Sequence, residues 1–282
     1  MVVELLSGKT VVIDATVGAG GHAEALLRGG VGTVIGLDRD EATLRGTVAR
    51  LGSFGARFRP VRSRFSMLAE VVRDLGVRAA GGVLFDLGVS SMQLDTPGRG
   101  FSYRSAGPLD MRMGSADPGP TAATVVNTYP EERLADVIYL YGEERRSRSI
   151  ARAIVRARGR APIAGTDELA AIVAGAVPRR RGGPHPARRT FQALRIEVNQ
   201  ELEELAASLP QAASLLEPAG RLVVISYHSL EDRTVKRFLS QDPLFLPLTR
   251  RPIRPSVAEV AANPRARSAL LRAAERRTEA AA

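Results

Sequence analysis

The first 90 residues alternate short, β-branched apolar runs with segments of helical periodicity, and this alternation leaves few possible folds. The apolar runs cover residues 11–18, 33–38, 58–63 and 81–88. Helical patterns follow the first three runs, at 20–28, 40–50 and 66–75. Strands that alternate with helices predict an α/β fold whose parallel sheet is covered by helices on both faces. A further strand is expected at 221–228, before a helix-like segment.

Strand signals are absent between about Gly114 and Pro210, where helical periodicity takes over. This stretch begins in a Gly- and Pro-rich segment, which is typical of a domain boundary. We therefore predict an α/β domain made of residues 1–113 and 211–282, with a helical domain of residues 114–210 inserted into it. The tail after Pro243 is rich in Pro and Arg, and we expect it to wrap around the surface.

The chain carries a surplus of arginine. Its 282 residues include 40 Lys+Arg against 30 Asp+Glu, which gives a net charge of +10, and only Lys9 and Lys236 are lysines. A proteome that prefers Arg to Lys explains the residue type but not the surplus. The arginines concentrate in residues 145–160 and 179–189 of the predicted insertion, which favours a polyanionic partner such as a nucleic acid.

The composition excludes several kinds of site. The sequence contains no Cys, and therefore no disulfide, Cys-ligated zinc, iron–sulfur cluster or thiol nucleophile. Residues 1–10 show no charged leader followed by an apolar core, and no apolar run approaches the ~20 residues that a membrane span needs. We therefore expect a cytoplasmic chain that contacts no membrane and binds no metal.

A glycine turn follows the first predicted strand. The segment from Gly18 to Ala23 matches G-x-G-x-x-A between a strand and a helix, and such a turn brings backbone amides against a ligand. Asp38 ends the second strand 20 residues after Gly18, where a carboxylate can accept hydrogen bonds from ribose hydroxyls. This pattern suits a nicotinamide dinucleotide as well as S-adenosylmethionine. A glycine turn without any ligand is the alternative.

Two further acidic residues favour S-adenosylmethionine. Asp14, near the end of the first strand, can face the ammonium of an amino acid, and this cofactor has no pyrophosphate that needs neutralising. Asp86 ends the fourth strand at the carboxyl edge of the sheet, where open α/β folds bind ligands, and it can accept a hydrogen bond from an amine. A turn or cap role is the alternative for Asp14, Asp38 and Asp86.

Seven blocks of sequence, in one order along nearly the whole chain, carry a specific resemblance. They are DATVGAGGH (14–22), GLDRD (36–40), DLGVSSMQLD (86–95), RGFSYRSAGPLDMRM (99–113), HPARRTFQALRIEVNQELEEL (185–205), SYHSLEDRTVKRF (226–238) and NPRARSALLRAAER (263–276). Together they resemble the bacterial 16S ribosomal RNA cytosine-N4-methyltransferase family, known as RsmH or MraW. The resemblance implies a Rossmann-like, S-adenosylmethionine-dependent methyltransferase domain with an inserted helical substrate-recognition domain. It also implies methylation of the exocyclic N4 amine of a cytidine in the decoding centre.

The cofactor contacts that the resemblance implies fall on seven residues of this chain. They are Gly20, Gly21, His22, Asp38, Phe65, Asp86 and Gln93. Only the resemblance gives His22 and Phe65 a role, because a lone His at a helix start is ordinarily a cap and a lone Phe is ordinarily core. Asp86 is also the leading catalytic candidate, as an acceptor for the hydrogens of the target amine.

The segment SYHSLED contains a second catalytic candidate, His228, as a general base. A helix cap with a surface ion pair is the alternative role for this segment. Six arginines are predicted to contact RNA phosphates, with a solvated basic face as the alternative. They are Arg179, Arg180, Arg181, Arg188, Arg189 and Arg195. The predicted partner is 16S ribosomal RNA or the small ribosomal subunit, and we expect a monomer or a homodimer.

The start of the chain departs from the family pattern. Family members usually begin with a His-x-Pro-Val-like segment and a helix, whereas only MVVELLSGKT precedes the first strand here. We expect a gene start assigned too far downstream, or a chain that lacks this segment. Without the segment, one wall of the cofactor or substrate site would be missing.

Two other function classes fit parts of the sequence. A nicotinamide-dependent oxidoreductase fits the glycine turn, but the chain has no evident hydride-transfer constellation and this reading leaves the basic insertion unexplained. A nonenzymatic RNA-binding or ribosome-assembly factor fits the basic insertion, but the cofactor positions are intact. Cofactor titration separates them, since the oxidoreductase prefers NAD and a factor with a decayed site binds neither cofactor.

Overall fold

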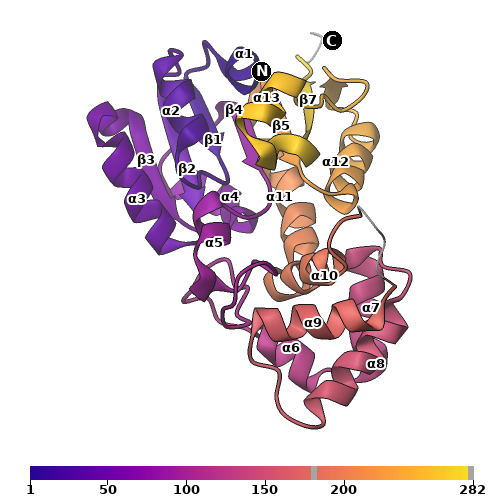
Figure 1. Cartoon of the computed structure of the whole chain (residues 1–282). Helices are drawn as coiled ribbons and strands as arrows, with labels where there is room; N and C mark the ends of the chain where they lie inside the picture. The colour runs from indigo at the N-terminus through magenta and orange to yellow at the C-terminus, as the bar shows by residue number, and fades with distance from the viewer. Residues whose placement is uncertain (179–182, 279–282) are drawn as a thin grey trace. The chain divides into compact units, whose positions relative to one another are not determined.

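The computed structural model describes residues 1–178 and 183–278 (Figure 1). The chain divides into two compact units, each with its own contacts. The α/β unit consists of Met1–Gly88 and Leu202–Ala282, and the helical unit consists of Val89–Glu201. No helix within the described ranges is both long and apolar enough to cross a membrane.

The α/β unit is built on one seven-stranded sheet. Its strands are β1 (Val11–Asp14), β2 (Thr33–Asp38), β3 (Phe58–Arg62), β4 (Ala80–Asp86), β5 (Leu216–Ser226), β6 (Phe245–Pro247) and β7 (Leu270–Arg276). They lie in the order β3-β2-β1-β4-β5-β7-β6, with β7 antiparallel to β5 and β6 and the other pairs parallel. The strand order switches direction between β1 and β4, and the carboxyl ends at such a point form the usual ligand edge of an open sheet.

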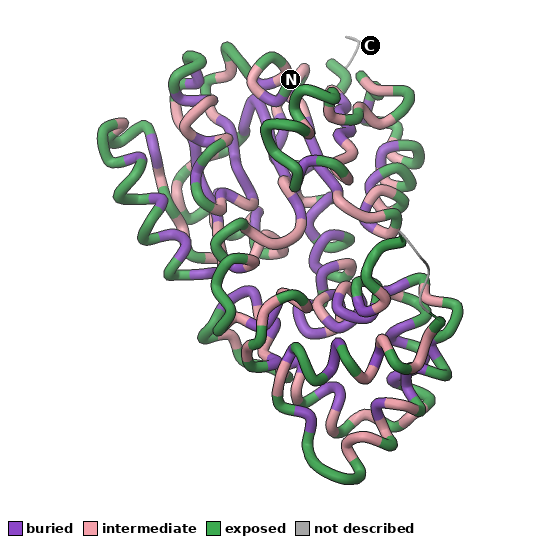
Figure 2. Tube along the Cα trace, in the orientation of Figure 1, coloured by how far each residue is buried: buried purple, intermediate pink, exposed green. Residues whose placement is uncertain are grey.

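Successive residues of a strand point to opposite faces of the sheet, and apolar side chains on both faces are therefore covered by helices. The helices of the unit are α1 (Val2–Leu6), α2 (Gly21–Arg28), α3 (Glu41–Leu51), α4 (Leu68–Asp74), α11 (Glu201–Leu215), α12 (Ser229–Gln241) and α13 (Val257–Ala262). Ile13 and Phe85 belong to a buried cluster with residues of α4, α11 and α12. Val12 and Leu84 belong to a second buried cluster with residues of α1, α2 and α3. Figure 2 shows the buried strands between these layers, and the predicted α/β fold is confirmed.

The helical unit has a core of its own. Its helices are α5 (Ser91–Asp95), α6 (Ala122–Thr128), α7 (Glu131–Gly142), α8 (Ser147–Arg158), α9 (Thr166–Ala176) and α10 (Arg188–Asn199). Short 3-10 helices complete the chain at η1 (Gly52–Arg57), η2 (Phe65–Met67), η3 (Pro97–Arg99) and η4 (Pro264–Ser268). Leu134, Ile150, Leu169 and Leu194 bring α7, α8, α9 and α10 into one buried cluster.

The boundaries of the units differ from the predicted 113/114 and 210/211. Residues 89–113 belong with the helices because Leu109 and Met111 are buried in the core of the helical unit. Most of α11 belongs with the sheet because Leu205 and Leu209 pack in the sheet's core. The Gly- and Pro-rich segment therefore lies inside the helical unit and not at its edge.

The tail is a second correction, because part of it enters the sheet where we expected it to wrap around the surface. β7 pairs with β5 on one side and with β6 on the other, and Ala273 and Ala274 are fully buried. An antiparallel strand at this position also means that the sheet is mixed, whereas the alternation of strands and helices predicted parallel pairing.

Candidate active site

Acidic and hydroxyl side chains collect at the carboxyl edge of the sheet in the α/β unit. Asp14, Asp38 and Asp86 are the last residues of β1, β2 and β4, and Tyr227 directly follows β5. Burial is the largest cause that raises the pKa of Asp14, and the negative charges of Asp86 and Asp38 raise it further. Three carboxylates thus share one edge of a chain whose net charge is +10, which favours a cationic ligand there.

Asp38 organises the glycine turn. Its Oδ2 accepts a hydrogen bond from Gly18 N at 3.0 Å, and its Oδ1 accepts one from Asp40 N at 2.8 Å. The Thr47 hydroxyl on α3 donates to the Gly18 carbonyl and ties the turn to that helix. Burial raises the pKa of Asp38 to about 6, although both backbone hydrogen bonds oppose the rise. Asp38 therefore fills the turn role, and each oxygen keeps a lone pair for a hydroxyl donor.

Gly20 and Gly21 are glycines for different reasons. Gly20 has φ +81°, and a Cβ placed on it would lie 2.8 Å from Thr47 Cγ2, so both the backbone and the packing require glycine. Gly21, the first residue of α2, has an ordinary φ, and a Cβ there would meet no atom within 4 Å. No described residue of the α/β unit requires glycine at position 21, which agrees with a ligand approaching this backbone.

We predict opposite results for alanine at these two positions. Gly20→Ala should lower the free energy of unfolding by about 2–4 kcal/mol, because it adds a strained φ and a steric overlap. Gly21→Ala should leave that free energy unchanged or raise it slightly, yet weaken cofactor binding. Urea unfolding and cofactor titration of both variants check this. Equal stability of the two variants would contradict the geometry of the turn.

Asp14 is the most unusual group of the edge. Its side chain is almost fully buried, its Oδ1 accepts from Thr16 N at 3.2 Å, and its Oδ2 has no hydrogen-bond partner among the described residues. Burial raises its pKa to about 7, and the nearby His22 opposes the rise. A buried acceptor without a donor is costly, so this oxygen is well suited to receive a donor from a ligand.

Asp86 is held by three elements at once. The Tyr227 hydroxyl donates to its Oδ1 at 2.9 Å, and His22 Nε2, from the start of α2, lies 3.3 Å from its Oδ2. Its backbone N–H donates to the Thr16 hydroxyl at 2.6 Å. Burial lowers the pKa of His22, but the hydrogen bond and charge of Asp86 outweigh burial and raise it overall. Burial and Asp86 raise the pKa of Tyr227 far above its ordinary range, so its hydroxyl keeps the proton that it donates.

Phe65 and Gln93 occupy different units. Phe65, in η2 after β3, is half-buried against the core of the sheet and meets Phe85 edge-on at 5.8 Å between ring centroids. Gln93, in α5 of the helical unit, is buried in a capping box with Ser90, and its Nε2 donates to Met113 O at 3.0 Å. These contacts are enough to account for the burial of Gln93, and its predicted cofactor contact remains a prediction.

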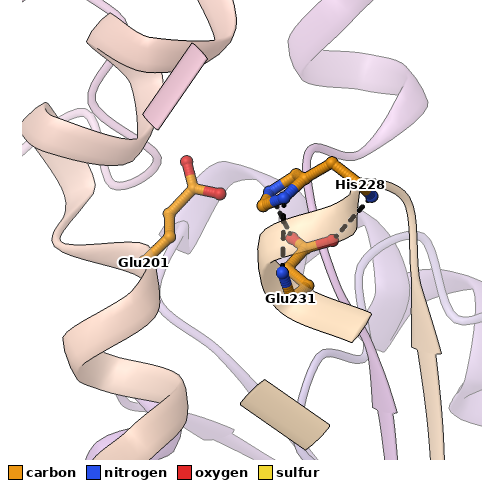
Figure 3. Close-up of side chains that lie close together, drawn as sticks. All are labelled: Glu201, His228 and Glu231. Carbon is orange, nitrogen blue, oxygen red and sulfur yellow. Dashed lines mark hydrogen bonds and ion pairs between the residues drawn. The ribbon is translucent and has the colours of Figure 1, made fainter. Parts of the chain in front are cut away.

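His228 is the N-cap of α12, and its role as a general base remains a prediction. Its Nδ1 accepts from Glu231 N at 3.4 Å, and the Glu231 carboxylate accepts from the backbone N–H of His228 (Figure 3). The same carboxylate accepts from the backbone N–H of Tyr227. His228 Nε2 lies 3.1 Å from Glu231 Oε1, and the His228 side chain is only 8% exposed. The imidazole therefore caps the start of α12, which is the alternative role predicted for this segment.

The predicted RNA contacts divide into three groups. Arg179, Arg180 and Arg181 lie outside the described residues. Arg188 and Arg189 are exposed at the start of α10, where Arg189 forms a 3.5 Å ion pair with Glu144. The Arg195 guanidinium donates two hydrogen bonds to the Glu201 carboxylate, at 2.8 and 2.7 Å, and its side chain is only 15% exposed. This two-point ion pair gives Arg195 a structural role, and its contact with RNA remains a prediction.

Sequence reasoning missed Thr16 and Tyr227. Thr16 follows β1 within the block DATVG, and Tyr227 stands in the block SYHSLED beside the residue that we chose, His228. A hydroxyl within two residues of the end of a parallel strand is the signal that identifies both, because such ends converge at one edge. The pairing of Tyr227 with Asp86, 141 positions away in the chain, has no sequence signal.

Comparison with known proteins gives one consistent answer. The model of the MraW methylase family matches residues 2–277. Three similar proteins each carry the name ribosomal RNA small subunit methyltransferase H. The one from Nitrobacter winogradskyi is 52% identical over 96% of this chain and 86% of its own length. The one from a Methylobacterium species is 51% identical over 98% and 87%, and the one from Acidothermus cellulolyticus is 52% identical over 94% and 87%.

Proposed function

The chain belongs to the MraW methylase family and is an S-adenosylmethionine-dependent methyltransferase, and from this premise we propose that its acceptor is the N4 amine of a cytidine in the decoding centre of 16S ribosomal RNA. The names of its relatives support ribosomal RNA of the small subunit as the substrate class. The proposal places the reaction in the cytoplasm. The observation that carries it is the acidic carboxyl edge, where Asp86 is held by Tyr227 and His22.

The residues of this edge fit S-adenosylmethionine. The unpartnered Oδ2 of Asp14 suits a hydrogen of the cofactor's ammonium, and the carboxylates together suit its two positive charges. Asp38 retains acceptor capacity for ribose hydroxyls, and the half-buried ring of Phe65 offers an apolar surface for adenine. Gly20 and Gly21 allow close approach of the backbone. When bound, the cofactor supplies an electrophilic methyl group.

We assign to Asp86 the orientation of the target amine. The lone pair of a cytosine amine is delocalised into the ring, so an acceptor for the amine hydrogens favours the pyramidal nitrogen that attack requires. The Asp86 carboxylate is such an acceptor, and its oxygens are kept in place by Tyr227 and His22. Orientation of this kind supplies a large part of the rate of a group transfer. The nitrogen becomes positive on transfer, and the carboxylate of Asp86 stabilises that charge.

Cofactor affinity should rise with pH between about pH 6 and pH 8. The Asp14 carboxyl has a pKa of about 7 in the free protein, so it is largely protonated at pH 6 and largely charged at pH 8. A cationic ligand stabilises the charged form, and its binding must therefore release a proton. Calorimetric titration in buffers of different ionisation enthalpy measures this release. Asp14→Asn should remove most of it and leave the smaller release expected of Asp38, whose pKa is about 6. Proton release by this variant equal to that of the parent would contradict the assignment.

The reaction itself is tested with labelled S-adenosylmethionine and small ribosomal subunits from cells that lack this enzyme. Nuclease digestion and mass spectrometry then identify the methylated nucleoside. Label in N4-methylcytidine supports the proposal. Label in another nucleoside would overturn the proposed acceptor but keep the methyltransferase, and cofactor binding without any transfer would overturn RNA of the small subunit as the substrate.

The RNA-contact role of Arg188 and Arg189 belongs to the same proposal. Both side chains are exposed on the first turn of α10, where a guanidinium can reach a phosphate without loss of a buried contact. The cofactor role of Gln93 and the monomeric or homodimeric state are likewise proposals.

A further inference from the structure

The helical unit contains a basic groove between α8 and α9. The groove is lined on one side by Arg152, Arg156 and Arg160, and its floor includes the half-buried Ala153 and Ile172. The two helices pack against each other, so the groove is a feature of this unit alone. We name it the α8–α9 groove.

Two of its arginines have no counterion within the part of the chain that the structure describes. Among residues 1–178 and 183–278, the guanidinium groups of Arg156 and Arg160 have no ion-pair or hydrogen-bond partner, and both residues are exposed. Arg152 has only a long contact, 3.6 Å to Glu131, and its side chain is 66% exposed. The helix dipole favours basic residues only in the last turn of α8, so it does not account for the presence of all three arginines. Arg158 already serves the structure there, because it donates to Val126 O and Tyr129 O at 2.7 Å.

The spacing of these arginines suits a linear polyanion. Residues four apart lie on one face of a helix, with about 6 Å between successive positions along the axis. Arg152 and Arg156 have this spacing within α8, and Arg160 repeats it just beyond the helix end. The repeat is similar to the step between successive phosphates of an RNA strand. Guanidinium groups bind phosphate oxygens at two points, which favours Arg over Lys in such a row.

Gly175 on the opposite side keeps the groove open. It lies in the last turn of α9 without the positive φ that makes glycine a helix C-cap, and a Cβ there would meet no atom within 4 Å. Glycine at a helical position lowers stability relative to alanine. Among the described residues of the helical unit, no contact or backbone conformation requires glycine at position 175, and the lack of a side chain there leaves the groove open.

We propose that the α8–α9 groove binds the sugar–phosphate backbone of RNA, with Arg152, Arg156 and Arg160 each facing a phosphate. The inference rests on the proposed function, in which the substrate is ribosomal RNA, and it adds a binding site apart from the arginines of α10. An RNA strand is favoured over an acidic protein because the charges form a row along small, apolar floor residues.

The test compares two charge-matched double variants of the full chain. Arg156→Gln with Arg160→Gln removes the unpaired charges of the groove. Arg73→Gln with Arg78→Gln removes the same charge from exposed residues of the α/β unit, at α4 and just before β4, which is the amino edge of the sheet. Binding to a 16S ribosomal RNA transcript is measured at several salt concentrations.

We expect the groove variant to bind about tenfold more weakly, with a salt slope smaller by about 1.5, and the control to match the parent protein. Equal affinity and slope for the two variants would overturn the proposal. If the two variants then differed only toward intact small subunits, the groove would be assigned to a protein partner instead. Binding is measured without methyl transfer, so a parent protein that binds RNA through the groove but does not methylate it would refute only the proposed reaction.

A second pair of variants tests the open space. Gly175→Ala and Gly175→Leu should both fold with a melting temperature at least equal to that of the parent, since each replaces a helical glycine. Only Gly175→Leu fills the groove, and only it should weaken RNA binding. Unchanged binding by Gly175→Leu would contradict the proposed path of the strand.

Discussion

Replacing Asp86 with asparagine should lower the rate of methyl transfer about a hundredfold or more and leave the chain folded. Both carboxylate oxygens of Asp86 face donors, the Tyr227 hydroxyl at 2.9 Å and His22 Nε2 at 3.3 Å. Asparagine has one acceptor oxygen and places an NH₂ group against one of these donors. It thereby loses both the charge and the orientation that we assign to the site. The measurement is the single-turnover rate at saturating cofactor and RNA.

Two companion variants sharpen this experiment. Tyr227→Phe removes one donor but keeps the carboxylate, and it should lower the rate about tenfold. Asp74→Asn neutralises an exposed carboxylate at the end of α4 and should not change the rate. Cofactor titration of each variant separates a loss of binding from a loss of transfer. An Asp86→Asn enzyme with the parent's rate would remove Asp86 from the reaction.

Replacing Asp14 with asparagine should make the free protein more resistant to unfolding at alkaline than at acidic pH, relative to the parent. Burial raises the pKa of Asp14 from an ordinary value of 3.8 to about 7. Between these values the folded chain binds more protons than the unfolded chain, so the parent loses stability as pH rises. The variant has no carboxyl group at position 14, so its free energy of unfolding does not fall with pH for this reason.

The size of the effect follows from the same linkage. The free energy of unfolding of the variant minus that of the parent should increase by up to about 4 kcal/mol between about pH 4 and pH 8. The pH dependence is the decisive quantity, because any fixed cost of an unpaired Nδ2 is the same at both ends. Urea unfolding at four or five pH values measures it, with Asp74→Asn as the control. A difference that does not change with pH would mean that the Asp14 charge is already compensated in the folded protein.

Local patterns accounted for the framework of the α/β unit. The runs at 11–18, 33–38 and 81–88 became β1, β2 and β4, because side-chain alternation and helical periodicity are properties of neighbouring residues. The positions of Asp14, Asp38 and Asp86 at one edge follow from this alone, since parallel strands end together.

Two of the corrections concern contacts between distant segments. β7 enters the sheet between β5 and β6, although its sequence LLRAAER has little strand character. The boundary at Gly88 depends on Leu109 and Met111, which pack in the core of the helical unit. Their sequence does not indicate which of the two cores they join. The ion pair of Arg195 with Glu201 is by contrast local, because the two residues lie six positions apart.

The sequence by itself therefore determined the layers of the α/β unit, the glycine turn and the acidic residues at the strand ends, because each depends on a short stretch of chain. Only the tertiary structure decided which groups meet. Tyr227 and Asp86 lie 141 positions apart in the chain and meet because β4 and β5 are neighbours in the sheet. Among residues 1–178 and 183–278, the lack of a counterion at Arg156 and Arg160 likewise depends on which side chains the fold places beside them. The sequence determines the chemistry of each residue, but the fold of the whole chain determines which residues are its partners.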